Sequence, residues 1–216
     1  MIMRCFSFLL VIVLLFLLEL EIVADEMIAK HDFNVHHVLL PSRYSTPRTT
    51  PITHIMIHSI SNLVSKPESP YEINDIRLLL MEHGVSAHYV IDRKGKVFQL
   101  VQENRVAFHA GRNDLPNAPF FDHRMNDYSI GIELMGIGTK EEMVPIVSEK
   151  LYNQLDTSLI GFTKEQYLSL SNLLAYLYKR YPTIKKSRYH VIGHEDYAPN
   201  RKSDPGRLFN WSDVGL

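Results

Sequence analysis

Hydrophobic and polar positions follow one another in short blocks along the chain, and the apolar blocks rich in β-branched residues predict strands. Residues 53–59 (THIMIHS) and 128–136 (YSIGIELMG) are almost continuously apolar, which is typical of strands covered on both faces. Residues 189–194 (YHVIGH) form a shorter block of the same kind. Two further β-rich runs within residues 86–101 are joined by RKG at 93–95, so we expect a hairpin with glycine at its turn.

Two blocks with a helical period lie between these strands. Apolar residues recur every three or four positions from 71 to 83 and stop at Gly84, which predicts a helix of about three turns. Residues 163–181 open with Thr163 and Gln166, the pattern of a capping box, and then present a stripe of leucines. Because strands, a hairpin and helices are interspersed, we predict an α/β fold: one domain with a central mixed β-sheet flanked by helices.

Two segments show no sustained period. Residues 25–50 are polar and contain prolines, and we interpret them as an ordered lead-in or N-terminal arm. Residues 137–160 mix charged, proline and apolar positions with weak helical spacing, and we interpret them as an insertion within the domain. The predicted domain itself spans residues 51–216.

The N-terminal residues form the most apolar stretch of the chain. Residues 6–18 contain a single serine among apolar side chains, and only Arg4 precedes them as a charged residue. A membrane-spanning helix needs about 20 apolar residues, so this run is short, and its position favours a secretory signal peptide over residues 1–24. We expect cleavage after Ala24 and an exported, secreted or envelope-associated protein; an uncleaved membrane anchor is the alternative. Cys5 precedes the apolar run, which argues against a lipid-modified cysteine at the cleavage site.

Charge and cysteine content narrow the classes of function. The 23 basic and 24 acidic residues give a formal net charge of −1, so no broad basic field exists to bind nucleic acid. Removal of residues 1–24 takes away one basic and two acidic residues, which leaves 22 of each and no cysteine. Stability of the remaining chain must then come from its core or from a bound metal rather than from disulfides. The 11 histidines make a metal worth considering.

Candidate chemistry lies at the ends of the predicted strands. His58 is at the end of the first strand, and His194 and Asp204 accompany the last one, with Lys202 nearby. Catalytic zinc takes three such protein ligands and keeps one position for water. Spacing alone leaves structural histidines as the alternative. Glu133 lies in the middle of an apolar strand, where a charge requires a partner or a function.

Six blocks of the sequence, taken in order, resemble the zinc-dependent N-acetylmuramoyl-L-alanine amidase family, which includes phage amidase-type lysozymes and peptidoglycan recognition proteins. They are residues 53–59, 86–92 (SAHYVID), 109–111 (HAG), 126–136 (NDYSIGIELMG), 162–182 and 193–206 (GHEDYAPNRKSDPG). Together they cover roughly residues 50–211, and the last block is the most specific. The resemblance implies an amidase and peptidoglycan-recognition-protein-like fold.

The resemblance also implies a role for each candidate. His58, His194 and Asp204 would bind Zn²⁺, with Asp204 in the place where some members have cysteine. Glu133 would be the general base that takes a proton from water, and a structural ion pair is its alternative. Lys202 would stabilise the oxyanion of the tetrahedral intermediate, and a solvated loop charge is its alternative.

Three further histidines have weaker assignments. His109 matches a recurrent family histidine, and it either lines the substrate groove or has a packing role. We interpret His88 as structural. His54 shares the strand face of His58, which makes it a candidate to support the metal ligands. The segment 137–160 would border the groove.

The function implied by the resemblance is zinc-dependent hydrolysis of the amide between N-acetylmuramic acid and the L-alanine of the stem peptide. Peptidoglycan or muropeptides are the expected partners, and export makes the intact polymer the first substrate to consider. A non-catalytic peptidoglycan-binding module of the same fold is the main alternative. Hydrolysis of another amide and a protein-interaction role rest on fold analogy alone.

Overall fold

A six-stranded mixed sheet forms the centre of the computed structural model, which describes residues 34–113 and 123–216. In sheet order its strands are β1 (Val35–His37), β5 (Val97–Gln99), β4 (Tyr89–Ile91), β7 (Ser129–Met135), β3 (His54–Ile60) and β8 (Val191–Gly193). Within this six-stranded sheet, only the β4–β5 pair, the predicted hairpin, is antiparallel. A second sheet pairs β2 (Ser45–Pro47) with β6 (Arg105–Ala107). The mixed sheet confirms the predicted fold class.

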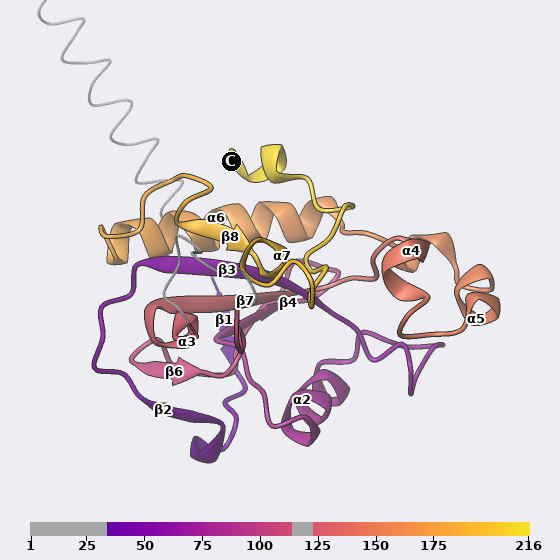
Figure 1. The fold of residues 1–216 in the computed structure, drawn as a ribbon, viewed down its shortest axis with the longest axis horizontal. Helices are drawn as coiled ribbons and strands as arrows, with labels where there is room; N and C mark the ends of the chain where they lie inside the picture. Colours follow the sequence, from indigo (N-terminus) through magenta and orange to yellow (C-terminus); the bar gives the residue numbers. More distant parts are fainter. Residues whose placement is uncertain (1–33, 114–122) are drawn as a thin grey trace, which may run out of the picture. The chain divides into compact units, whose positions relative to one another are not determined.

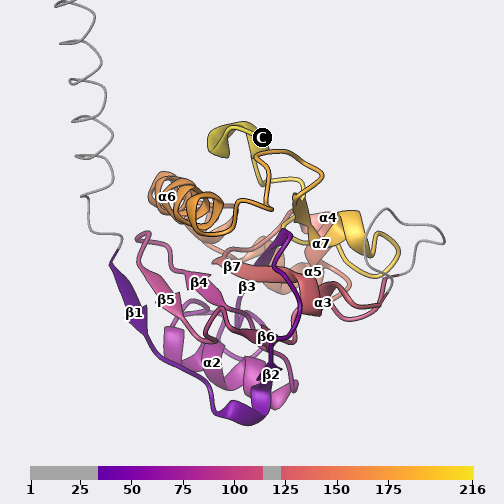
Figure 2. The same cartoon turned by 90° about the vertical axis from the view of Figure 1, so that its left-hand side faces the viewer.

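Helices cover both faces of this sheet, with α6 (Lys164–Arg180) on one side and α2 (Ile73–Glu82) on the other (Figures 1 and 2). The shorter helices are α3 (Met125–Tyr128), α4 (Lys140–Met143), α5 (Glu149–Asn153) and α7 (His194–Tyr197), and the 3₁₀ turns are η1 (Ser42–Tyr44), η2 (Thr157–Leu159) and η3 (Trp211–Val214). No helix in the described part of the chain is long and apolar enough to cross a membrane.

The capping box predicted at the start of α6 is present, and it also connects the helix to the sheet. The side chain of Thr163 accepts from the backbone of Gln166, whose side chain reaches back to the Thr163 N–H. Gln166 is fully buried, and its Nε2 donates to the carbonyls of Ile91 and Met135 at the ends of β4 and β7. One side chain therefore begins the helix and satisfies two strand ends.

The register of β3 and β7 decides which side chains share a face. His58 pairs with Glu133 and Ile60 pairs with Met135, and partners in a parallel pair point to the same side of the sheet. Met135 packs with residues of α2 in one core cluster. His58 and Glu133 therefore lie side by side on the face that α2 covers.

Residues 35–50 form an ordered lead-in to the domain rather than a separate arm. The compact unit runs from Val35 to Leu216, and this segment contributes β1 and β2 to its sheets. Arg48 holds the segment in place by donating to the backbone carbonyls of Glu103, Arg105 and Ser129. Strands of three residues are too short to show a period in the sequence, so the pattern could not reveal them.

The segment 137–160 is an ordered part of the unit. It contains α4, α5 and η2, and Ile137 and Val147 form a core cluster with Leu63. Side-chain caps begin each short element: Thr139 for α4, Ser148 for α5 and Asp156 for η2. Short elements of this kind depend on local caps rather than on a long apolar stripe, which explains the weak helical spacing. The predicted signal peptide, residues 1–24, lies outside the described residues.

Candidate active site

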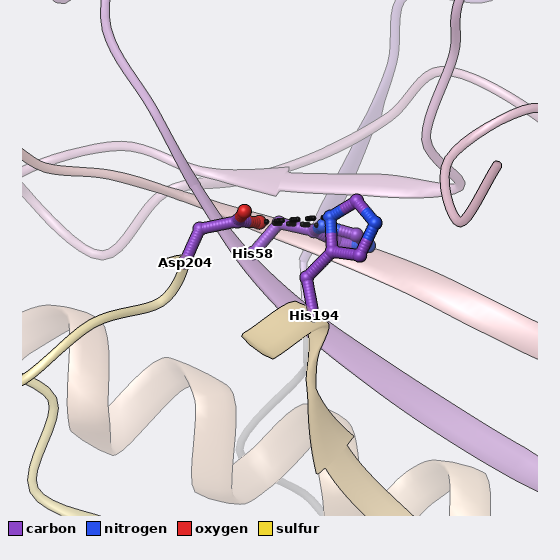
Figure 3. A group of neighbouring side chains, drawn as sticks. All are labelled: His58, His194 and Asp204. Atoms are coloured by element: carbon purple, nitrogen blue, oxygen red, sulfur yellow. Dashed lines mark hydrogen bonds and ion pairs between the residues drawn. The ribbon is translucent and has the colours of Figure 1, made fainter. Parts of the chain in front are cut away.

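Three predicted metal ligands converge at one edge of the sheet. β3 and β8 are parallel neighbours, so their carboxyl ends lie together. His58 is near the end of β3, and His194 follows β8 directly as the first residue of α7. Asp204 lies in the loop after α7, and its carboxylate points from that loop toward the rings of His58 and His194 (Figure 3).

The distances within this group are short. Asp204 Oδ2 lies 2.8 Å from His58 Nδ1 and 3.2 Å from His194 Nδ1. The two rings are nearly perpendicular, with centroids 4.6 Å apart, and their side chains are buried. One possible ligand atom from each residue lies within 4.8 Å of the others, which is the spacing of a metal site.

Burial and hydrogen bonding set the charges of these groups. Burial lowers the pKa of His58 from 6.5 to about 4, although the interaction with Asp204 opposes the shift. Burial alone would raise the pKa of Asp204, but its interactions with His194 and His58 outweigh this effect and hold that pKa far below 3.8. Near neutral pH the site therefore contains a carboxylate beside a neutral His58 ring.

The donor set fits a zinc ion. His194 Nε2 lies 2.8 Å from the carbonyl oxygen of Ala110, which can only accept, so the ring proton is on Nε2. The other ring nitrogen, Nδ1, lies 3.2 Å from Asp204 Oδ2, and it would supply its lone pair to a zinc ion held beside that carboxylate. Two imidazoles and one carboxylate form a common catalytic zinc set with one open position.

Glu133 is the second buried acid beside this group. Its side chain lies between His58 of β3 and Val90 of β4 in the sheet register, and it is 8% exposed. Among the described residues, its Oε2 atom has no hydrogen-bond partner. Burial, together with the charge of Asp204, raises the pKa of Glu133 to about 8, and Lys202 partly opposes this. A buried carboxyl with a free oxygen and a pKa near neutrality is suited to proton transfer.

All the predicted site residues line one cavity of about 560 Å³. They are His58, His109, Glu133, His194, Lys202 and Asp204. The C-terminal part of α2 contributes Leu79, the loop after this helix contributes Val85, and Ile146 from the segment 137–160 also lines the cavity. The segment therefore borders this cavity, and its part in a substrate groove stays a prediction.

The three weaker histidines have different surroundings. His109 Nδ1 lies 3.0 Å from His58 Nε2, so His109 both lines the cavity and packs against a predicted ligand. His88 joins two strands, since its Nδ1 accepts from the N–H of Gly131, which agrees with a structural role. His54 is four residues before His58, about 13 Å away along the strand, and its ring stacks on His190. Its expected place beside the metal ligands is therefore wrong, because a shared strand face does not bring residues four apart together.

Several residues that support the site were not singled out in the sequence. Asn126 Oδ1 accepts from the backbone N–H groups of His109 and Ala110, at 2.9 and 2.8 Å, and so shapes the loop that faces both ligand rings. Glu195 Oε2 accepts from the Gly206 N–H, close to Asp204. The signal for Asn126 was its place at the start of the NDYSIGIELMG block. Nothing in the pattern marked Glu195, since acidic residues are common in loops.

Comparison with known families agrees with this geometry. The profile of the N-acetylmuramoyl-L-alanine amidase family (Amidase_2) matches residues 48–207. The chain belongs to this family. The resemblance drawn from the six sequence blocks is thereby confirmed.

Two curated relatives of this chain are informative. The chain is 36% identical over 127 residues to the 1,6-anhydro-N-acetylmuramyl-L-alanine amidase AmpD of Haemophilus influenzae, covering 59% of this chain and 55% of the relative. It is 33% identical over 142 residues to the N-acetylmuramoyl-L-alanine amidase AmiD of Escherichia coli, covering 62% of this chain and 45% of the relative. The matched parts thus span about half the length of these relatives.

Solved structures of the family share the fold. A selenomethionine derivative of AmpD superposes with a TM-score of 0.62 and 27% identity, over 83% of this chain and 92% of that one. AmiD of E. coli, in complex with anhydro-N-acetylmuramic acid-L-Ala-D-γ-Glu-L-Lys, superposes with a TM-score of 0.55 and 28% identity, over 81% of this chain and 59% of that one. The α/β architecture is thus the one found in these amidases.

Proposed function

We propose that this protein is a zinc-dependent amidase that hydrolyses the bond between N-acetylmuramic acid and the L-alanine of the stem peptide. The observation that carries the proposal is one cavity in which His58, His194 and Asp204 converge beside the buried acid Glu133 and the cation Lys202. Family membership supports the same reaction. A peptidoglycan-binding module without catalysis would not need a buried carboxyl with a free oxygen beside three metal-type ligands.

Each residue has a part in amide hydrolysis. His58, His194 and Asp204 would hold the zinc, which when bound supplies a Lewis acid and lowers the pKa of water. Glu133 takes a proton from the attacking water and returns it to the leaving nitrogen, because an amide nitrogen leaves poorly unless it is protonated. The ammonium group of Lys202 stabilises the negative charge that develops on the carbonyl oxygen.

The substrate proposed is any peptidoglycan fragment with this amide bond. The AmpD relatives are named for 1,6-anhydro-N-acetylmuramyl-L-alanine, and the AmiD complex contains an anhydro-muropeptide, which favours anhydro-muropeptides. Export would instead place the enzyme beside the intact polymer. Both substrates therefore belong in the same assay.

The test is hydrolysis by the zinc-loaded full-length protein. Purified peptidoglycan and a 1,6-anhydro-muropeptide are incubated separately with it, and the products are examined by mass spectrometry. We expect free peptides that begin with alanine, their loss on chelation and their return with Zn²⁺. Zinc-loaded protein that sediments with peptidoglycan but cuts neither substrate would support the binding module instead.

We further propose that residues 1–24 direct export of the protein. The support is the short apolar run at residues 6–18 after Arg4. Cell fractionation, followed by N-terminal sequencing of the mature chain, tests this. Asp25 as the first residue is expected after cleavage, and an intact N-terminus in the membrane fraction would indicate an uncleaved anchor. Full-length protein in the cytoplasmic fraction would contradict export.

A further inference from the structure

Ser129 begins a chain of buried hydrogen bonds that leads to the proposed zinc site. It is fully buried, and its Oγ lies 2.5 Å from the carbonyl oxygen of Met125 and 3.1 Å from His109 Nε2. A carbonyl oxygen only accepts, so the single hydroxyl proton of Ser129 points to Met125. Ser129 Oγ is then an acceptor toward His109, and His109 carries its proton on Nε2.

The proton position on His109 in turn determines which nitrogen of His58 carries its proton. His109 is buried, and the partners of its two ring nitrogens, Ser129 and His58, carry no negative charge, so the ring has no anion to hold a second proton. A neutral imidazole has one N–H, and His109 uses it on Ser129. Its Nδ1 therefore accepts, and the donor 3.0 Å away is Nε2–H of His58.

This chain of hydrogen bonds ends at the metal-facing nitrogen of His58. Because Nε2 faces His109 and donates to it, Nδ1, the atom 2.8 Å from Asp204 Oδ2, is the nitrogen whose lone pair would be available to zinc. We propose that Ser129 and His109 are positioning residues, a relay that fixes the His58 tautomer so that Nδ1 is the zinc ligand. This inference rests on the proposed zinc-dependent function and deepens it.

The packing of His109 supports the relay independently of the hydrogen bonds. A Cβ atom at Gly131 of β7 would lie 2.5 Å from Cγ of the His109 ring. The ring therefore lies directly on the strand backbone, which only glycine permits, and it has no room to turn away from Ser129 and His58. Asn126 Oδ1 also accepts from the backbone N–H of His109 and so helps to fix its position.

The same loop serves both histidine ligands. His109 accepts from Nε2 of His58, and the carbonyl of the next residue, Ala110, accepts from Nε2 of His194. Both rings thereby turn Nδ1 toward Asp204. Partners of this kind orient metal-bound histidines, and their loss typically costs about 10–100-fold in metal affinity.

The test compares zinc affinity in variants of the relay. Zinc is titrated into each purified protein in competition with a chromophoric chelator. For His109→Leu, which removes the acceptor, we expect affinity to fall by about 10–100-fold. His109→Asn places an amide oxygen near the position of Nδ1 and should recover most of this loss. Ser129→Ala leaves the His109 N–H without its acceptor and should weaken binding by about 10-fold.

Ser45→Ala is the matched control. Ser45 is also a buried serine, but its hydroxyl accepts from Arg105, away from the cavity. We expect this variant to lose some stability and to bind zinc as the wild type does. Wild-type affinity in both His109→Leu and Ser129→Ala would overturn the relay.

Nitrogen-15 NMR of the histidine rings gives a readout that needs no variant. In the zinc-loaded wild type we expect protons on Nε2 of His58 and of His109, and metal on Nδ1 of His58. A proton on Nδ1 of His109 would overturn the relay even if every variant failed to fold. Zinc binding with these tautomers but without hydrolysis would contradict the proposed function and leave the relay intact.

Discussion

Glu133 is buried beside His58, and its Oε2 atom has no hydrogen-bond partner among the described residues. A substitution at this position can therefore test catalysis separately from metal binding. We predict that Glu133→Gln lowers kcat by about 10²–10⁴-fold, because glutamine cannot accept the proton from water. Zinc affinity should stay within a few-fold of wild type, since Glu133 is not one of the three converging ligands. Steady-state kinetics and a chelator competition assay measure the two quantities. A parallel loss of zinc would instead assign Glu133 to the metal site.

We also predict that Glu133→Gln changes how the stability of the metal-free protein depends on pH. Burial raises the pKa of Glu133 from 4.5 to about 8, so the folded state favours the protonated acid. The stability that this group contributes is complete below 4.5 and is lost as pH rises through about 8. Because glutamine does not ionise, Glu133→Gln should gain stability relative to wild type across this window.

Urea unfolding in the presence of chelator, at several pH values, measures this difference. Using the difference between the two proteins removes the contribution of His58, whose pKa shift has the opposite sign and is common to both. The advantage of Glu133→Gln should be largest above the raised pKa. An advantage independent of pH would mean that Glu133 is already ionised in the folded state.

At the scale of single residues, the sequence predicted which groups carry charge or bind metals. The structure brings these groups to one cavity: His58, Glu133, His194, Lys202 and Asp204. Their roles remain predictions. The sequence did not single out Ser129, because a serine in a strand has no feature that distinguishes a relay from ordinary packing. Its partner is 20 residues away and meets it only in the folded protein.

At the scale of the elements, the carboxylate of Glu142 connects the segment 137–160 to the loop that carries Asp204. Glu142 completes the capping box of α4 by accepting from the Thr139 N–H at 2.7 Å, and its other oxygen accepts from the Arg207 N–H at 2.9 Å. Arg207 is three residues after Asp204. The start of α4 therefore holds the loop that presents a proposed zinc ligand.

We predict that Glu142→Ala costs about 1 kcal/mol of stability through the lost cap and also weakens zinc binding by about 10-fold. The matched control is Ser148→Ala, which removes the N-cap of α5 in the same segment without touching the Asp204 loop. It should cost similar stability and leave zinc affinity unchanged. Thermal unfolding and chelator competition distinguish the two effects. Equal zinc affinity in both variants would show that the loop is held by other contacts, such as Glu195 with Gly206.

Elements with a long apolar period were predictable, and short elements were not. The expected helix at 163–181 is α6, and the expected hairpin is β4 and β5, since each has several turns or an alternating pair of runs to reveal it. β1 and β2 are three residues each, and their stability comes from pairing with β5 and β6 far along the chain. Tertiary pairing of this kind leaves no local pattern.

The distribution of ligands links metal binding to the stability of the whole molecule. His58 is on β3, His194 follows β8, and Asp204 is in a loop near the C-terminal end of the chain, 146 residues from His58. An unfolded chain cannot hold these groups together, so zinc binds the folded state almost exclusively. Folding and metal binding are therefore coupled.

We predict that zinc raises the free energy of unfolding by about 2.7 kcal/mol when free Zn²⁺ is 100 times its dissociation constant. Urea unfolding of the chelated and zinc-loaded proteins measures this difference. Asp204→Ala should unfold at the same urea concentration with and without zinc, because it lacks the only carboxylate of the converging group. Asp204→Cys keeps a zinc ligand at the same place and should recover much of the zinc-dependent gain. Stabilisation of Asp204→Ala equal to that of the wild type would mean that zinc stabilises the fold at another site, since surface histidines remain in that variant.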